Sequence, residues 1–199
     1  MKLEKYLVLN KYFLTLLGFE DIKELIDTMK HCKEGYDYNS RSYYVDRLIG
    51  LKNKIIDEEQ LLYYDEVIKS YVEQISERRG IFNLKYFQYI SVLFTEIFLD
   101  KYFNNKDAFI IELNSFLEQY NSQNNTNITP YNKDNLKKLA FWIATGGGKT
   151  LIMHINYLQI IKYYDKWDNI ILITPNDGMS IQHYKEMIQS GIPCKLHDG

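Results

Sequence analysis

The sequence is poor in cysteine, in net charge and in the features of a secreted protein. Its 199 residues include two cysteines, Cys32 and Cys194, and the formal net charge is −2. Lys5 and Lys11 interrupt the apolar residues near the start of the chain, and no small-residue cleavage site follows them, which argues against a signal peptide. We therefore expect a cytoplasmic protein in which both cysteines are free thiols.

Long hydrophobic runs and an excess of basic residues are also lacking. The most apolar stretch, residues 90–99, contains Glu96 and ends at Asp100, well short of the length that spans a bilayer. We interpret it as core and expect no membrane partner. The small net charge gives no general basic surface for nucleic acid, so a nucleic-acid function has to be argued from local motifs. The hydrophobic content of 46% is enough to bury a core in one or two domains.

Residues 1–120 predict a helical domain, because they are rich in tyrosine, poor in glycine and periodic at helical spacing. Residues 3–17 and 20–30 flank Gly18 and resemble a helical hairpin. Residues 121–135 begin with an asparagine-rich polar stretch, which we interpret as a linker or surface insertion. Two further apolar stripes follow. The first has steps of three and one, at Leu61, Tyr64, Val67, Ile68, Tyr71, Val72 and Ile75, and the second has steps of three and four, at Leu84, Phe87, Ile90, Phe94 and Ile97.

A glycine-rich segment follows the apolar residues 139–142. Residues 143–150 read Ile-Ala-Thr-Gly-Gly-Gly-Lys-Thr, and residues 151–161 continue without glycine or proline, as a buried helix would. Strand, loop and helix in this order predict a phosphate-binding loop for ATP and Mg²⁺. Lys149 would reach the phosphates, Thr150 would hold the metal, and the backbone cradle would consist of Ala144, Thr145, Gly146, Gly147 and Gly148.

A second unit follows the predicted helix. Residues 169–174 form a β-branched run that predicts a buried parallel strand, and Thr174-Pro175-Asn176 then leads into a helix that carries Gln182. The polar groups at such a helix start can donate to the phosphates of a nucleic-acid backbone. The alternative is an ordinary turn in which Asp177 caps the helix.

These two motifs resemble those of superfamily 2 helicases. The strict phosphate-loop pattern has glycine where this chain has Ile143, and that family tolerates the change. Residues 145–150 are similar to motif I, and residues 174–176 to motif Ia, of the DEAD/DEAH group, above all the type III restriction-enzyme Res subunits and UvrB-like helicases. The resemblance covers about residues 136–199.

The resemblance implies an α/β fold, in which the N-terminal helical domain is followed by the start of a RecA-like P-loop parallel sheet over residues 136–199. It implies an ATP-dependent DNA helicase or translocase of a restriction or defence system, with a possible methyltransferase or nuclease partner. Lys149 and Thr150 would be catalytic. Gln88, behind an aromatic pair, would bind the adenine. Contacts to nucleic acid would come from Thr174, Pro175, Asn176 and Gln182.

The acidic pair that positions Mg²⁺ and the attacking water in such motors does not follow the loop. We therefore expect these 199 residues to be the amino-terminal part of a larger enzyme, with no ATP turnover of their own. Two alternatives stay open. One is a P-loop NTPase of another kind, and the other is a non-enzymatic interaction module with a vestigial motor lobe.

Overall fold

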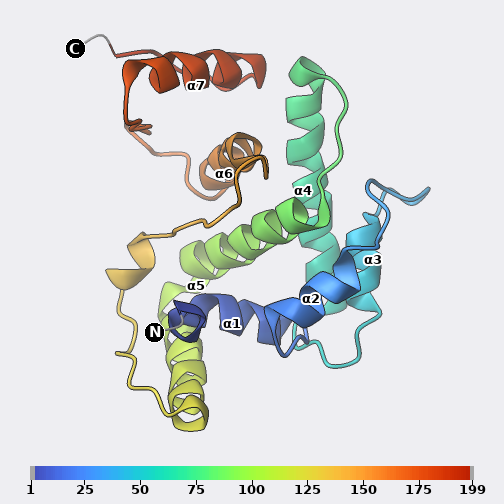
Figure 1. The fold of residues 1–199 in the computed structure, drawn as a ribbon, viewed down its shortest axis with the longest axis vertical. Coiled ribbons are helices and arrows are strands. Elements are labelled where there is room, and N and C mark those ends of the chain that lie inside the picture. Colours follow the sequence, from blue (N-terminus) through green and yellow to red (C-terminus); the bar gives the residue numbers. More distant parts are fainter. Residues whose placement is uncertain (1–2, 198–199) are drawn as a thin grey trace.

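The computed structural model describes residues 3–197, and its named elements are helices (Figure 1). Short 3₁₀ turns, η1 and η2, precede α1 and α6. The bounds are η1 (Leu3–Tyr6), α1 (Val8–Leu16), α2 (Ile22–Met29), α3 (Tyr43–Ile49), α4 (Glu58–Arg79), α5 (Tyr86–Asn124), η2 (Asn135–Lys137), α6 (Lys149–Tyr163) and α7 (Asp177–Gln189).

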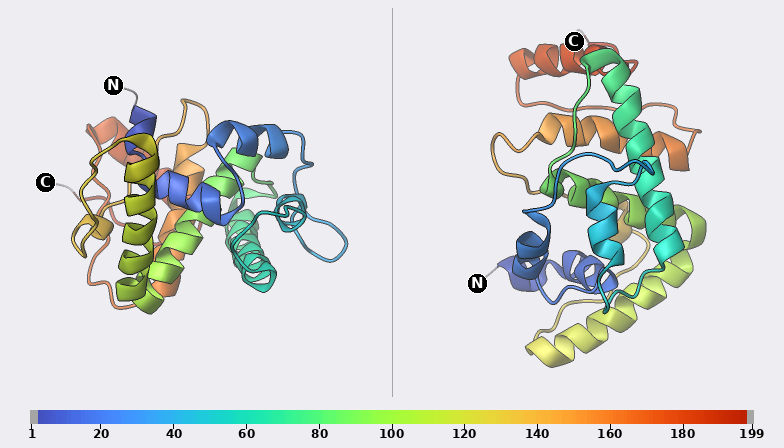
Figure 2. Two further views of the ribbon diagram at one scale, coloured as in Figure 1. Left: turned by 90° about the horizontal axis from the view of Figure 1, so that it is seen from below. Right: turned by 90° about the vertical axis from the view of Figure 1, so that its right-hand side faces the viewer.

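Helix α5 is the centre of the fold, and α1, α4 and α6 pack against it. Figure 1 and the right-hand view of Figure 2 show α6 lying between α5 and α7, with α4 crossing the direction of these helices at one side. The apolar stripe predicted from Leu61 onward is the buried face of α4, although Val67 is only half-buried. Acidic residues in the first turn of α4 and Arg78 and Arg79 in its last turn complement the helix dipole. The helices predicted from periodicity are therefore present.

Helix α5 consists of two helical halves joined by a kink at Asn105. That residue has φ −154° and ψ 68°, outside the helical region. Its side-chain oxygen accepts a hydrogen bond from the Ala108 N–H at 3.2 Å, as an N-cap does at the start of a helix. The local hydrogen bond thus offsets the interruption of the helix and lets the second half pack against α1, where Tyr12 contacts Phe109 and Phe116.

The predicted α/β fold with a RecA-like parallel sheet is wrong. Over residues 3–197 the regular secondary structure is helical and there is no sheet. Strand-type pairing in this range is limited to an isolated bridge between Tyr36 and Ser42. Residues 139–143 and 169–173 have no regular secondary structure. Their side chains are largely exposed, with Trp142 at 93%, Ile171 at 79% and Ile173 at 87%.

The physical reason is that a parallel strand is stable only when neighbouring strands and covering helices bury it. The β-branched residues of 169–174 supply strand propensity, but propensity reflects the packing surface that a strand meets. The described residues before position 135 are mostly helical and provide no strand for these segments to pair with. Across residues 3–197, no helix combines the length and apolar character needed to cross a bilayer.

A buried carboxylate joins α4, α5 and α6. Glu96 of α5 is fully buried and accepts hydrogen bonds from three residues of α6: Gln159 at 2.8 Å, Lys162 at 2.9 Å and the Tyr163 hydroxyl at 2.9 Å. The Tyr71 hydroxyl of α4 donates to the same group at 3.3 Å. Burial, followed by the Glu96 charge, raises the pKa of Tyr163 well above the usual range for a phenol. The phenol therefore stays a neutral donor to the carboxylate.

Replacing Glu96 should destabilise the whole helical assembly. Glu96→Ala leaves the buried polar groups around it without an acceptor and should lower the free energy of unfolding by about 3 kcal/mol. This is the lower end for removing one member of a buried ion pair, because Lys162 is partly exposed and can turn to water. Urea unfolding followed by circular dichroism measures the change.

Glu118→Ala, at an exposed position of the same helix, is the matched control and should change stability by about 0.5 kcal/mol or less. Equal effects of the two substitutions would contradict the assignment.

Candidate functional site: a glycine loop at the start of a helix

The glycine loop, residues 143–150, forms a tight turn that leads directly into α6. Gly146 and Gly148 have φ of +78° and +79°, in the left-handed region that side chains disfavour. The Gly147 N–H donates to the Ala144 carbonyl at 3.0 Å and closes the turn. Helix α6 begins at Lys149, one residue after Gly148. The first N–H groups of a helix have no partner within the helix, so the loop ends at a set of amides suited to an anion.

At two of the glycines a side chain would also force a neighbouring side chain to move. A Cβ atom at Gly147 would lie 2.7 Å from Cγ2 of Ile143. A Cβ atom at Gly148 would lie 2.3 Å from Nε2 of Gln88. A Cβ at Gly146 would meet nothing within 4 Å, so that position needs glycine for its backbone conformation alone.

Lys149 folds back over the loop that precedes it. Its ammonium donates to the carbonyl of Ile143 at 2.8 Å and to that of Ala144 at 3.0 Å. The side chain is exposed. An ammonium has three donors, so these two bonds leave one for a phosphate oxygen. The predicted phosphate-binding lysine therefore lies at the mouth of the predicted cradle.

Gln88 lies against the loop, although it is far from it in the sequence. Its Nε2 donates to the Gly147 carbonyl at 3.1 Å, and its Oε1 accepts from the Lys85 N–H at 2.9 Å. Phe87, beside it, would be 3.7 Å from a Cβ at Gly147. The first turn of α5 thus forms one wall of the loop. The adenine contact assigned to Gln88 from the family resemblance stays a prediction.

Thr150 is half-buried in the first turn of α6, where its hydroxyl would take part in holding Mg²⁺. The donors of the loop are its amides, the Lys149 ammonium and the hydroxyls of Thr145 and Thr150, which suit phosphate oxygens. Mg²⁺ in such sites takes its ligands largely from the phosphates and water. Within residues 3–197, no cluster of three or more histidine, cysteine, aspartate or glutamate side chains is placed to hold a metal. The residues present fit a nucleotide triphosphate.

The predicted nucleic-acid residues gather at the start of α7. The Asn176 side chain accepts from the Met179 N–H at 3.0 Å and caps the helix, so the cap is Asn176 and not Asp177. The Thr174 hydroxyl donates to the Asn176 carbonyl at 3.2 Å, and Pro175 is exposed. The exposed Gln182 donates to Glu186 at 2.9 Å. The side chain of Asn176 therefore already has a structural partner, and the nucleic-acid contacts stay a prediction.

The end of α7 is attached to α6 and α4 by a buried polar contact that was not predicted from the sequence. Nδ1 of His154 lies 2.8 Å from Oγ of Ser190, and Arg79 donates to the same oxygen at 3.4 Å. His154 is fully buried and its Nε2 has no hydrogen-bond partner in the structure. Burial lowers the pKa of His154 to about 4, and the Arg79 charge adds to the effect.

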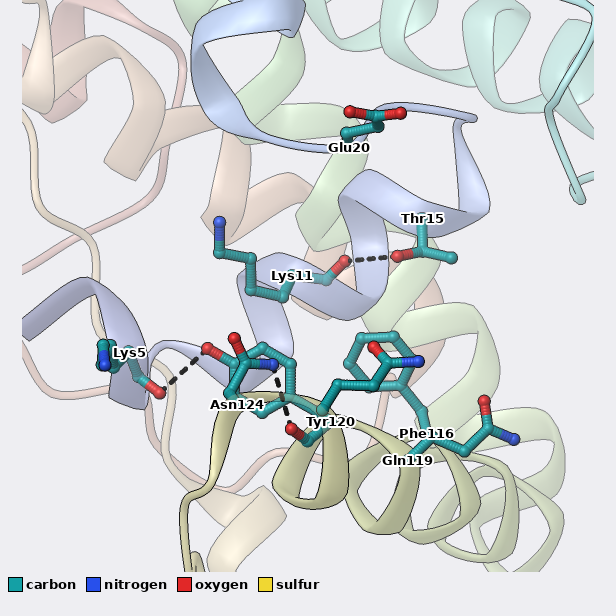
Figure 3. A pocket seen from close by; sticks show the side chains of 9 residues that line it. Lys5, Lys11, Thr15, Glu20, Phe116, Gln119, Tyr120 and Asn124 are labelled. Atoms are coloured by element: carbon teal, nitrogen blue, oxygen red, sulfur yellow. Dashed lines mark hydrogen bonds between the residues drawn. The ribbon is translucent and has the colours of Figure 1, made fainter.

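Two cavities lie away from the glycine loop. One, of about 490 Å³, lies between α1 and the second half of α5, where Lys11 and Tyr120 face it (Figure 3). The other, of about 670 Å³, is lined by aromatic side chains that include Phe98, Phe141 and Trp167. Neither has a residue of the glycine loop in its wall.

Comparisons of the chain with protein-family models, with curated proteins and with solved structures found no match.

Gly148→Ala should weaken the fold more than Gly146→Ala. Both substitutions place a side chain at a φ near +80°, at a cost of about 1–2 kcal/mol each. Only the Gly148 substitution also displaces Gln88. Chemical denaturation of the two variants measures the difference, since Gly146 controls for the backbone strain. If the Gly148 variant proved no less stable than the Gly146 variant, the contact with Gln88 would be refuted.

His154 should make the stability depend on pH in a defined window. Its pKa of about 4 in the fold lies below the ordinary value of 6.5, so the unfolded chain binds the proton more readily. The free energy of unfolding should therefore fall as pH drops from about 6.5 to about 4, and this contribution should level off below. His154→Gln removes the titrating group, so the difference between wild type and variant should change with pH only in that window. A difference that is constant from pH 8 to pH 4 would contradict the buried neutral histidine.

Proposed function

We propose that the glycine loop binds the phosphates of a nucleoside triphosphate, with ATP and Mg²⁺ as the ligands. The observation that carries the proposal is the juxtaposition at the start of α6. A turn with two glycines at positive φ leads into the helix, and Lys149 folds back over that turn. The first amides of α6 and the Lys149 ammonium thus belong to one short segment, and phosphate recognition uses this combination of donors.

Binding of this kind depends on the loop and the helix and does not require a sheet. The amides at the start of α6 and the helix dipole favour negative charge. Lys149 has one donor left for a phosphate oxygen, and Thr150 lies in the first turn, where its hydroxyl would serve the metal. The chemistry that bound ATP and Mg²⁺ would supply is phosphoryl transfer to water. The role of these residues would be to bind and orient the phosphates.

The wider function that we propose is that of a DNA helicase or translocase of the restriction or defence type. Its support is the sequence of residues 145–150 and 174–176. Thr174, Pro175, Asn176 and Gln182 would contact the DNA backbone at the start of α7. We also propose that the protein resides in the cytoplasm. Cys32 and Cys194 are free thiols.

A second candidate is a non-enzymatic interaction module. The exposed apolar side chains of residues 139–142 and 170–173 favour it, because exposed apolar surface commonly marks a protein interface. Such a module would have no use for the cation at position 149. The two functions therefore differ in what a Lys149 substitution does.

Lys149→Ala should weaken MgATP binding at least about tenfold, because it removes a charge-assisted hydrogen bond to phosphate. The thermal unfolding temperature should stay close to that of the wild type, since the side chain is exposed. Titration calorimetry with MgATP measures the affinity.

Lys185→Ala is the matched control, because it makes the same change in net charge at an exposed position of α7. Its affinity should equal that of the wild type. Absence of MgATP binding by the wild-type chain, or equal binding by the two variants, would remove the nucleotide-binding proposal and favour the interaction module.

A further inference from the structure

Both polar atoms of the Gln88 amide are engaged by the protein backbone. Oε1 accepts from the Lys85 N–H, and Nε2 donates to the Gly147 carbonyl. One partner is a donor and the other an acceptor, so only one orientation of the amide satisfies both. The residue is 8% exposed, so it is held between the first turn of α5 and the loop.

The bond to Gly147 determines how the next peptide unit is oriented. In a trans peptide the C=O and the following N–H point in opposite directions. With the Gly147 carbonyl directed at Gln88, the Gly148 N–H is directed away from α5. That amide is the last one before α6, whose own first amides continue the series.

We propose that Gln88 is a positioning residue for phosphate binding: it holds the Gly147–Gly148 peptide so that the Gly148 N–H faces the bound phosphates. This inference depends on the proposed function of the loop. It assigns Gln88 to the triphosphate part of the ligand and leaves the base to other groups. The close approach of Gly148 to Gln88 follows directly, because a side chain at position 148 would push the amide off the loop.

The role predicts a pattern of affinities that base recognition would not produce. Gln88→Met keeps the length of the side chain and removes both hydrogen bonds. It should weaken binding of MgATP, MgGTP and magnesium tripolyphosphate by the same factor, about tenfold for one hydrogen bond. Tripolyphosphate has no base, so an adenine contact would leave its affinity unchanged.

Gln88→Glu provides a second variant. It keeps the acceptor for the Lys85 N–H, loses the donor to Gly147 and adds a negative charge near the phosphates. Its loss of tripolyphosphate affinity should exceed that of the methionine variant. Gln119→Met, at an exposed position of the same helix, should bind like the wild type.

Titration calorimetry with the three ligands decides between the outcomes, and far-UV circular dichroism confirms that each variant is folded. A loss confined to MgATP, or no loss at all, would overturn the positioning role while leaving the loop as a nucleotide site. Failure of the wild type to bind any of the three ligands, or an unchanged affinity in Lys149→Ala, would instead overturn the proposed function itself. A uniform loss in folded Gln88 variants, with intact binding by Gln119→Met, supports the proposal.

Discussion

The buried carboxylate of Glu96 is the interaction on which the arrangement of α4, α5 and α6 depends. A charge without water must be matched by donors, and here Tyr71, Gln159, Lys162 and Tyr163 supply them. Three of the four donors come from the last turns of α6, so the carboxylate determines where that helix lies on α5. The glycine loop precedes α6, and Gln88 precedes Glu96 on α5. The position of the loop therefore follows from a contact about two turns from Gln88 along α5 and about three to four turns from Lys149 along α6.

Local features of the molecule could be predicted from the sequence. The glycine triplet before Lys149 predicted a loop that leads into a helix, and the structure has a turn at these residues followed directly by α6. The apolar spacing from Leu61 to Ile75 predicted the buried face of α4, since a helix brings such positions to one side. Each of these predictions needs only a few consecutive turns of chain.

The non-local features could not be predicted in the same way. The β-branched residues of 169–174 predicted a strand, but a strand exists only if other segments pair with it, and pairing is a property of the fold. Glu96 was noticed as an interruption in an apolar run, yet its partners lie 63 to 67 positions away in α6. Gln88 was singled out through a family resemblance, whereas its bond to Gly147 spans 59 positions. No pattern in the sequence predicted the contact between His154 and Ser190.

The kink at Asn105 divides α5 into two units of different cooperativity. Residues 86–104 are held by α4 and α6 through the Glu96 contacts, so they can open only when those helices separate. Residues 106–124 are held by α1, through the rings around Tyr12, and by the bond from Tyr120 to the Lys5 carbonyl in η1. Asn114 and Asn121 also bind the segment that follows the helix, at Tyr131 and Ile128. Because the helix is already interrupted at Asn105, fraying that starts at Asn124 can end at Asn105. The far half can exchange its amide hydrogens through local opening while the support of the glycine loop stays folded.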